Sequence, residues 1–252
     1  MRHRFEEPHV KNLTFAFGQR GHQGAYRFPI GDVVDLWVDI TNCIGDQPAA
    51  IARIVCSDRC VQRLEPVSIA CNEAFDDLLV GNAEQRLLSV VDVRMGRLVV
   101  HLPLAVQPRN FCFKSDGGQL LITGLGMDAL VVVYPYTTEV AETVLAGREP
   151  GFMAECATGD TDYVFVTNPQ SGQVTILDID ARKVVAVVAV GAGPAYVTPT
   201  PDGQYALVLN RDSGDMAVIR LAAIAAKRSR SAPLFTIVPV GSRPVSAVIR
   251  PV

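Results

Sequence analysis

The sequence predicts an all-β fold, a β-propeller of four-stranded antiparallel blades, on three observations. Five prolines open similar segments at spacings of 42, 42, 44 and 50 residues: Pro66, Pro108, Pro150, Pro194 and Pro244. Each segment then repeats the same order of short apolar runs and polar turns. Many of these runs are continuous rather than alternating, which is typical of sheets buried on both faces. A period of about 40 residues with several strands per unit is the pattern of a propeller.

Each unit is expected to contain four strands in a constant order. The first strand follows the proline, as at 245–249, and a polar turn such as Pro201-Asp202-Gly203 comes after it. The remaining expected strands are second strands at 77–82, 163–168 and 205–210, third strands at 88–92 and 174–178, and a fourth at 183–190. A buried helix is the rival interpretation of 184–190, but the abundance of β-branched residues and the flanking turns favour a strand.

Glycines and asparagines recur at fixed places in the units. Gly147, Gly191 and Gly241 each stand three residues before a repeat proline, where glycine can take the positive φ of a tight connection and proline fixes φ as the next strand begins. Asn82 and Asn168 end second strands. Their short side chains can bond nearby backbone groups, so we interpret them as structural rather than catalytic.

These repeats resemble a known family. The segments 163–168 (YVFVTN) and 174–178 (VTILD), then Val190-Gly191 with Pro194, and finally Pro201-Asp202-Gly203, are similar to the YVTN family of β-propeller repeats. The unit that starts at Pro150 matches best, and the unit at Pro108 departs most, with Leu121-Ile122-Thr123-Gly124 in place of the core motif. The resemblance covers about residues 66–252. It implies a bacterial or archaeal propeller, often periplasmic or at the cell surface, that commonly serves in binding and assembly.

The repeats predict one propeller domain over 1–252. We expect divergent N-terminal strands in 1–65, repeats at 66–107, 108–149, 150–193 and 194–243, and a closing strand in 244–252. Within the N-terminal segment, 33–40 and 51–56 are expected to be strands. We predict about five blades, with six as the alternative, and a last blade that the N-terminal strands complete, which would leave no open sheet edge. Because family members usually have about seven blades, an incomplete ring that closes by pairing with another copy stays open.

Composition and charge indicate which partners and locations to expect. Apolar residues make up 49 % of the chain and charged residues 19 %, below the usual share of about 25 %. With a net charge of −3 and one short basic cluster at 227–230, which we interpret as a solvated loop, nucleic acid is not an expected partner. No apolar run is long enough for a membrane span. The N-terminus lacks the apolar stretch of a signal peptide, so we expect a cytoplasmic chain or a true start upstream, whereas the family implies the periplasm or cell surface.

A polar rim is the candidate site. The residues just before the repeat prolines should surround the axial opening on the face where the blades connect, and loops carry function on such scaffolds. The rim residues are Glu65, Gln107, Glu149, Gly193 and Arg243, with Arg109 and Arg148 beside them. Two carboxylates and several arginines could hold a cation or an anionic ligand. The alternative is a solvated rim whose charges pair with one another.

Other chemistry has less support. Cys71, Cys112 and Cys156 fall at similar points on successive first strands, where free cysteine serves as a small buried hydrophobe. The pair Cys56 and Cys60 lacks the second pair that a zinc site needs, so we predict structural thiols and no metal ligands. The four histidines show no HxxxH or HExxH spacing, and no GxSxG occurs, so no catalytic residue is assigned.

We therefore expect a non-enzymatic scaffold that binds a protein or small ligand through loops on one face. The first alternative is a lactonase-like, metal-dependent hydrolase at the axial opening, which requires convergent carboxylates with a nearby Asn or His. The second is an electron-transfer propeller with haem or quinone, cofactors that some family members carry. The repeat motifs specify the fold and not a reaction, so the sequence assigns no cofactor of its own.

Overall fold

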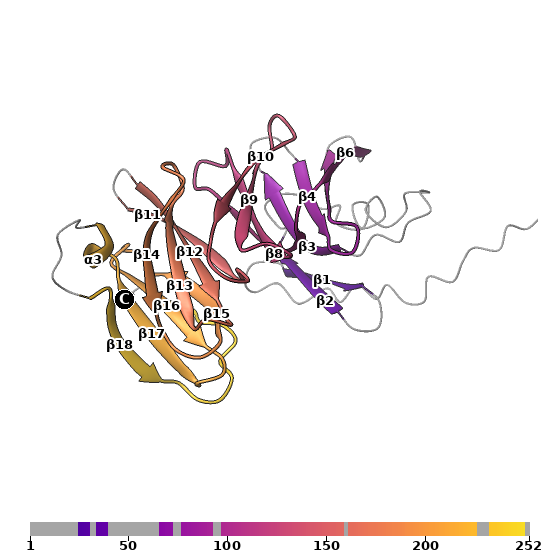
Figure 1. Ribbon diagram of the computed structural model, residues 1–252. Coiled ribbons are helices and arrows are strands. Elements are labelled where there is room, and N and C mark those ends of the chain that lie inside the picture. The colour runs from indigo at the N-terminus through magenta and orange to yellow at the C-terminus, as the bar shows by residue number, and fades with distance from the viewer. Residues whose placement is uncertain are drawn as a thin grey trace, which may run out of the picture.

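The computed structural model describes residues 25–30, 34–39, 66–72, 77–92, 97–158, 161–225 and 232–249 (Figure 1). Most of these residues form four sheets of four antiparallel strands, each a meander in which consecutive strands pair. A separate two-stranded hairpin, β1 (Ala25–Ile30) with β2 (Val34–Asp39), precedes them. The four-stranded antiparallel sheets that the repeats predict are thus confirmed.

The sheets follow one another along the chain and are numbered here as blades 1 to 4. Blade 1 contains β3 (Pro66–Asn72), β4 (Asp77–Asn82), β5 (Leu87–Asp92) and β6 (Arg97–Pro103). Blade 2 contains β7 (Gln107–Phe113), β8 (Leu120–Leu125), β9 (Ala129–Tyr134) and β10 (Glu139–Leu145). Blade 3 contains β11 (Met153–Thr158), β12 (Thr161–Asn168), β13 (Gln173–Asp178) and β14 (Lys183–Ala189). Blade 4 contains β15 (Pro194–Pro199), β16 (Tyr205–Asn210), β17 (Asp215–Arg220) and β18 (Leu234–Pro239), with the short helix α3 (Ala222–Ala225) between its last two strands.

The blades fan out along an arc (Figure 1), with the first strands β3, β7, β11 and β15 side by side. Each gap between neighbouring blades is filled by an apolar layer to which both contribute. Leu79 of blade 1 packs with Ile122 of blade 2, and Phe165 of blade 3 packs with Val208 of blade 4. Central strands such as β12 and β13 are therefore buried on both faces, which is why their sequences are apolar without alternation.

The asparagines that end second strands have the predicted structural role. Asn168 is buried, and its side-chain amide donates to the Val166 carbonyl at 3.3 Å and to Thr175 Oγ1 at 2.8 Å. Asn82 makes the same bonds at the same distances, to the Val80 carbonyl and to Ser89 Oγ. The asparagine therefore joins the second strand to the third inside the blade.

Blade 2 departs from the repeat for a steric reason. Gly124 pairs with Pro108 as Asn82 pairs with Pro66, so the glycine stands where blade 1 has its asparagine. A Cβ atom at Gly124 would lie 1.9 Å from the carbonyl oxygen of Gln107. Because the two backbones approach so closely, no side chain fits at this position.

At the ends of the chain, one expected strand is present and another is absent from the described structure. The strand expected at 33–40 is β2, and the strand expected at 51–56 lies outside the described residues. Residues 244–249, expected to begin a closing strand, belong to no strand of the structure, because no described strand lies beside them to accept or donate ladder hydrogen bonds. Whether the N-terminal segment completes a last blade, and the total of five or six blades, stay predictions. No helix among the described residues is long and apolar enough to span a membrane.

Candidate functional site

The rim residues predicted from the sequence lie at the end of the blades where one blade connects to the next. Gln107 begins β7 and is partly exposed, and Arg109 on the same strand is exposed. Arg148 and Glu149 lie in the connection between β10 and β11, and Arg243 lies in the segment after β18, all three exposed. Glu65, the second carboxylate of the predicted rim, lies outside the described residues.

The backbone that carries Glu149 is held in place by neighbouring turns. Its amide donates to Asp128 Oδ1 at 3.1 Å, and its carboxylate accepts a hydrogen bond from the Gln170 side chain. Glu149 has a φ of 48°, and Gly193 and Arg243, at the equivalent place before their own prolines, have φ values of 64° and 51°. Three connections thus have the same left-handed φ at the residue before the proline.

The charges of the rim are not paired with one another in the described structure. Glu149 is bonded to a glutamine rather than to an arginine, and no described residue forms an ion pair with Arg109, Arg148 or Arg243. An exposed guanidinium without a carboxylate partner keeps all five of its N–H donors for solvent or a ligand. The rim is therefore chemically suited to an anionic group.

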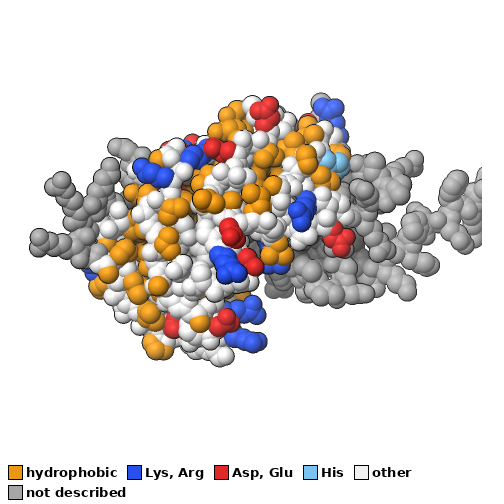
Figure 2. Space-filling model, viewed as in Figure 1, with side chains coloured by type: hydrophobic (Ala, Val, Ile, Leu, Met, Phe, Trp, Pro, Cys, Tyr) orange, Lys and Arg blue, Asp and Glu red, His pale blue; other side chains and the backbone are white. Residues whose placement is uncertain are grey.

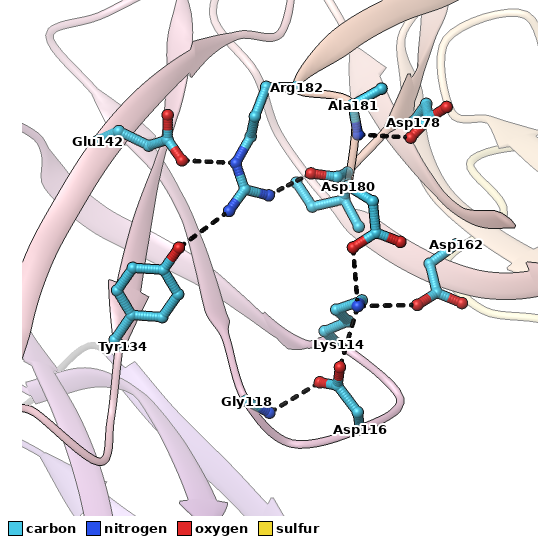
Figure 3. A network of polar contacts seen from close by, with 11 residues as sticks. Lys114, Asp116, Gly118, Tyr134, Glu142, Asp162, Asp178, Asp180, Ala181 and Arg182 are labelled. Atoms are coloured by element: carbon cyan, nitrogen blue, oxygen red, sulfur yellow. Dashed lines mark hydrogen bonds and ion pairs between the residues drawn. The ribbon is translucent and has the colours of Figure 1, made fainter.

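A second polar cluster lies at the opposite end of the blades, where the sequence had pointed to no site (Figure 3). Lys114, in the turn after β7, reaches three carboxylates. Its Nζ lies 2.9 Å from Asp116, 3.2 Å from Asp162 and 2.8 Å from Asp180. Because Asp162 and Asp180 belong to blade 3, this Lys114 cluster fastens blade 2 to blade 3.

The ion pairs raise the pKa of Lys114 and lower the pKa of Asp116. Hydrogen bonds to Asp180 and then Asp116 raise the pKa of Lys114. The bond from Lys114, together with the Gly118 amide, lowers the pKa of Asp116. Nearby Glu155 behaves differently, since burial is the main reason that its pKa is raised, and the charge of Asp162 adds to the effect. The cluster holds more carboxylates than cations, but Lys114 already occupies its centre.

Arg182 makes a parallel link between the same two blades. It lies in the turn between β13 and β14, and its Nε donates to Glu142 on β10 at 2.5 Å. Its other nitrogens donate to the Ile179 carbonyl and, at 3.4 Å, to the hydroxyl of Tyr134 (Figure 3). Together with Lys114, this arginine makes the blade 2–blade 3 junction the most polar contact that the structure describes, and we interpret it as structural.

The cysteines of the first strands do not share one position. Cys71 pairs with Leu78, Cys112 with Leu121 and Cys156 with Tyr163, which places the three at successive rather than equivalent points of the repeat. The thiols of Cys112 and Cys156 pack against apolar side chains, as predicted for structural cysteines. Burial, and secondly the charge of Glu155, raises the pKa of Cys112 to about 12. The remaining cysteines, Cys43, Cys56 and Cys60, lie outside the described residues.

Sequence reasoning missed the Lys114 cluster because its members come from two turns and the start of β12, which are far apart in the chain. In the sequence, the segment Lys114-Ser115-Asp116-Gly117 indicates only a polar turn. The signal that could have found the cluster is positional: turns after first strands and turns after third strands emerge at the same end of neighbouring blades. In the described part of the chain, no group of three or more His, Cys, Asp and Glu side chains is arranged to hold a metal ion.

Comparison with known proteins supports the architecture. No family model matches the chain, and no curated protein matches its sequence. Among solved structures it resembles hydrazine synthase of Kuenenia stuttgartiensis (TM-score 0.60, 18 % identity, 73 % of this chain and 52 % of that one). It also resembles a functionally unknown protein from Desulfotomaculum acetoxidans DSM 771 (TM-score 0.57, 14 % identity, 72 % of this chain and 58 % of that one). A third similar structure is dihydro-heme d1 dehydrogenase NirN in complex with DHE (TM-score 0.56, 16 % identity, 72 % of this chain and 40 % of that one).

The chain thus spans about half the length of the solved structures that it matches. At these levels of identity the likeness concerns the fold and not the activity. What the four sheets and the comparisons establish together is the architecture: the chain is a β-propeller protein with at least four blades.

Proposed function

We propose that this chain is a non-enzymatic binding propeller of the YVTN type, which holds an anionic protein segment or small anionic ligand against the rim. The observation that carries the proposal is the set of exposed arginines, Arg109, Arg148 and Arg243, that no described carboxylate neutralises. Guanidinium groups bind carboxylates and phosphates through paired hydrogen bonds, and these three stand where propeller loops commonly meet their ligands.

The rigidity of the rim supports binding as its role. The connection that carries Arg148 and Glu149 is tied to neighbouring turns through the bonds of Glu149 to Asp128 and Gln170, so its backbone has less conformational freedom to lose when a ligand binds. The YVTN assignment has separate support from the motif at 163–168 and from the prolines that recur along the chain.

The test is the affinity for an anionic probe. Because the whole chain carries a net charge of −3, a polyanion has no general attraction to it and needs a local positive surface. Fluorescence anisotropy with a labelled poly-L-glutamate peptide should show binding that weakens with added salt. The double variant Arg109→Ala, Arg148→Ala should bind roughly tenfold more weakly or worse, as expected when charge-assisted hydrogen bonds are lost.

The matched control is Lys183→Ala, which removes an exposed cation at the opposite end of blade 3. It should leave the affinity unchanged. Equal weakening by Lys183→Ala and by the arginine double variant would show only a diffuse effect of charge. That outcome, or an absence of binding by the unaltered chain, would contradict the proposal.

A further inference from the structure

Blade 4 is covered on one face only. Ala206, Val208 and Ala217 face blade 3 and belong to the apolar layer between the two blades. Side chains alternate along a strand, so Leu207, Met216 and Val218 point to the other side. These three side chains are partly exposed, and Val238, which pairs with Met216, is 40 % exposed. Leu207, Met216, Val218 and Val238 are called the free face below.

The free face has the composition of a surface that is buried elsewhere in the molecule. The repeat places Leu207, Met216, Val218 and Val238 where blade 3 has Phe165, Val174, Ile176 and Val188. The blade 3 residues pack against the next blade and are 0 to 5 % exposed. Blade 4 therefore carries the apolar surface for a following blade, but none of the described residues supplies one.

Exposed apolar side chains gather at this end of the molecule. Of the twelve large apolar side chains that are exposed among the described residues, six lie between Phe235 and Val248. Figure 2 shows hydrophobic side chains on the surface of blade 4. Apolar patches at one end of a soluble protein commonly mark a surface for another protein.

The chain leaves blade 4 as if a further blade followed. The amide of Val240 donates to the Gly214 carbonyl at 3.1 Å, and the equivalent bond after blade 3 joins Val190 to Gly172 at 3.0 Å. Arg243 then takes the same left-handed backbone conformation as Glu149 before blade 3. Beyond it, residues 244–249 pair with none of the described strands, and Val245 is 77 % and Val248 95 % exposed. They occupy the place of a first strand, and the described residues supply no further strand beside it.

At the other end of the arc, the β1–β2 hairpin forms a sheet of two strands rather than four. Among the described strands, β1 and β2 pair only with each other, and an isolated two-stranded sheet is at best marginally stable in water. β2 lies against β3 as β5, the third strand of blade 1, lies against β7. The hairpin therefore borders the first strand of blade 1, as a strand of one blade borders the first strand of the next.

We propose that the free face of blade 4 and residues 244–249 receive the β1–β2 hairpin of a second copy of this chain. The shared sheet would then take its first strand from one copy and its next two strands from the other. The hairpin of the same copy lies against β3, at the opposite end of the arc from β18 (Figure 1), so the hairpin that reaches blade 4 belongs to another molecule. The contact joins different surfaces of the two copies, and two such contacts close a ring of two chains.

The first test is the mass of the full chain in solution by size-exclusion chromatography with light scattering. We expect twice the mass of the 27.2 kDa chain, with dissociation on dilution. The variant Val238→Asp should weaken association roughly tenfold or more, because burial of an unpaired carboxylate in an apolar contact is costly. Val187→Asp makes the same change at an exposed valine on the outer strand of blade 3 and should leave association intact. A monomer at every concentration, or equal effects of the two variants, would overturn the proposal.

The second test separates a second copy from closure within one chain. Hydrogen exchange followed by mass spectrometry should show protection of the amides of 244–249 that rises with protein concentration and is lost in Val238→Asp. If these amides are protected to the same degree in dilute monomer, the chain's own N-terminal segment covers them and the second-copy proposal fails. If they exchange freely at all concentrations, no strand covers them and the proposal fails as well.

Discussion

Gly147 lies so close to the buried side chain of Asn168 that a Cβ atom at the glycine would come within 2.6 Å of Asn168 Oδ1. The same Cβ atom would meet Thr175 Oγ1 at 2.7 Å. The glycine precedes a repeat proline and the asparagine ends a second strand, so two marks of the repeat that are separate in the sequence meet in space. The connection between blades 2 and 3 therefore packs directly against the buried polar side chains of Asn168 and Thr175 in blade 3.

This contact predicts a large cost for Gly147→Ala. The backbone at Gly147 has a φ of +92°, and the new methyl group would also collide with Asn168 and Thr175. We expect the free energy of unfolding to fall by about 2 kcal/mol or more in urea denaturation. Gly241→Ala is the matched control: its φ is +107°, but no atom lies within 4 Å of the added Cβ. It should cost about 1 kcal/mol from strain alone, and equal losses in the two variants would show that the collision is unimportant.

Much of the fold could be read from the sequence because its signals are local. The strands at 77–82 and 205–210 were predicted to the residue, since each is a continuous apolar run that ends in an asparagine. The Lys114 cluster could not be read in this way. Lys114 and Asp180 lie on different blades, and only the packing of blade on blade brings them to 2.8 Å. The one-residue offsets of the three cysteines, by contrast, are already present in the sequence, since they stand five, four and six residues after their repeat prolines.

For the rim too, the sequence indicated where residues lie but not which residues they contact. The sequence located Arg148 and Glu149 correctly beside the blade connection, because a tight turn before a proline has a clear signature. It did not indicate the partners of Glu149, Asp128 and Gln170, which come from turns of two different blades. Whether the rim binds a ligand stays a prediction, since a polar loop end has the same composition with or without one.

The Lys114 cluster predicts stability that changes with pH at both extremes. The pKa of Asp116 is lowered, so its contribution is present above its ordinary value and is lost as the pH falls through the lower folded value. The pKa of Lys114 is raised, so its contribution is complete below the ordinary value of about 10.4 and is lost only as the pH rises through the folded value.

Removal of Lys114 should therefore cost stability across neutral pH. Lys114→Met leaves three carboxylates facing one another, and we expect a loss of about 1–2 kcal/mol, limited because Asp116 and Asp180 are half exposed and screened. Urea denaturation should give a difference from the unaltered protein that is constant from about pH 5 to 9 and shrinks below about pH 4. Lys183→Met, at an exposed lysine, should have little effect. A difference that does not change as the carboxylates gain protons would refute the role of the ion pairs.

The carboxyl group of Glu155 is expected to change stability with pH in the opposite direction from that of Asp116. Because burial raises its pKa, the folded state holds the carboxyl proton more tightly than the unfolded chain, and stability falls as the pH rises from the ordinary value of about 4.3 through the folded value. Glu155→Gln should be more stable than the unaltered protein at pH 7, and the gain should vanish below about pH 4. Melting temperatures at the two pH values measure it. Asp116→Asn should instead lose stability at pH 7, and two variants that change stability in the same direction would contradict the assignment.

The thiol of Cys112 should be inert in the folded protein. A pKa of about 12 leaves only a minute thiolate fraction at pH 8, whereas an unperturbed cysteine near 8.5 is substantially ionised. Alkylation by iodoacetamide, followed at Cys112 by peptide mass spectrometry, should be roughly a thousandfold slower in the native protein than in guanidinium. Glu155→Gln removes the smaller cause of the shift and leaves burial, so it should speed the reaction while keeping it well below the unfolded rate. Alkylation of native Cys112 at the unfolded rate would mean that the space between the first strands of blades 2 and 3 opens to solvent more readily than their packing indicates.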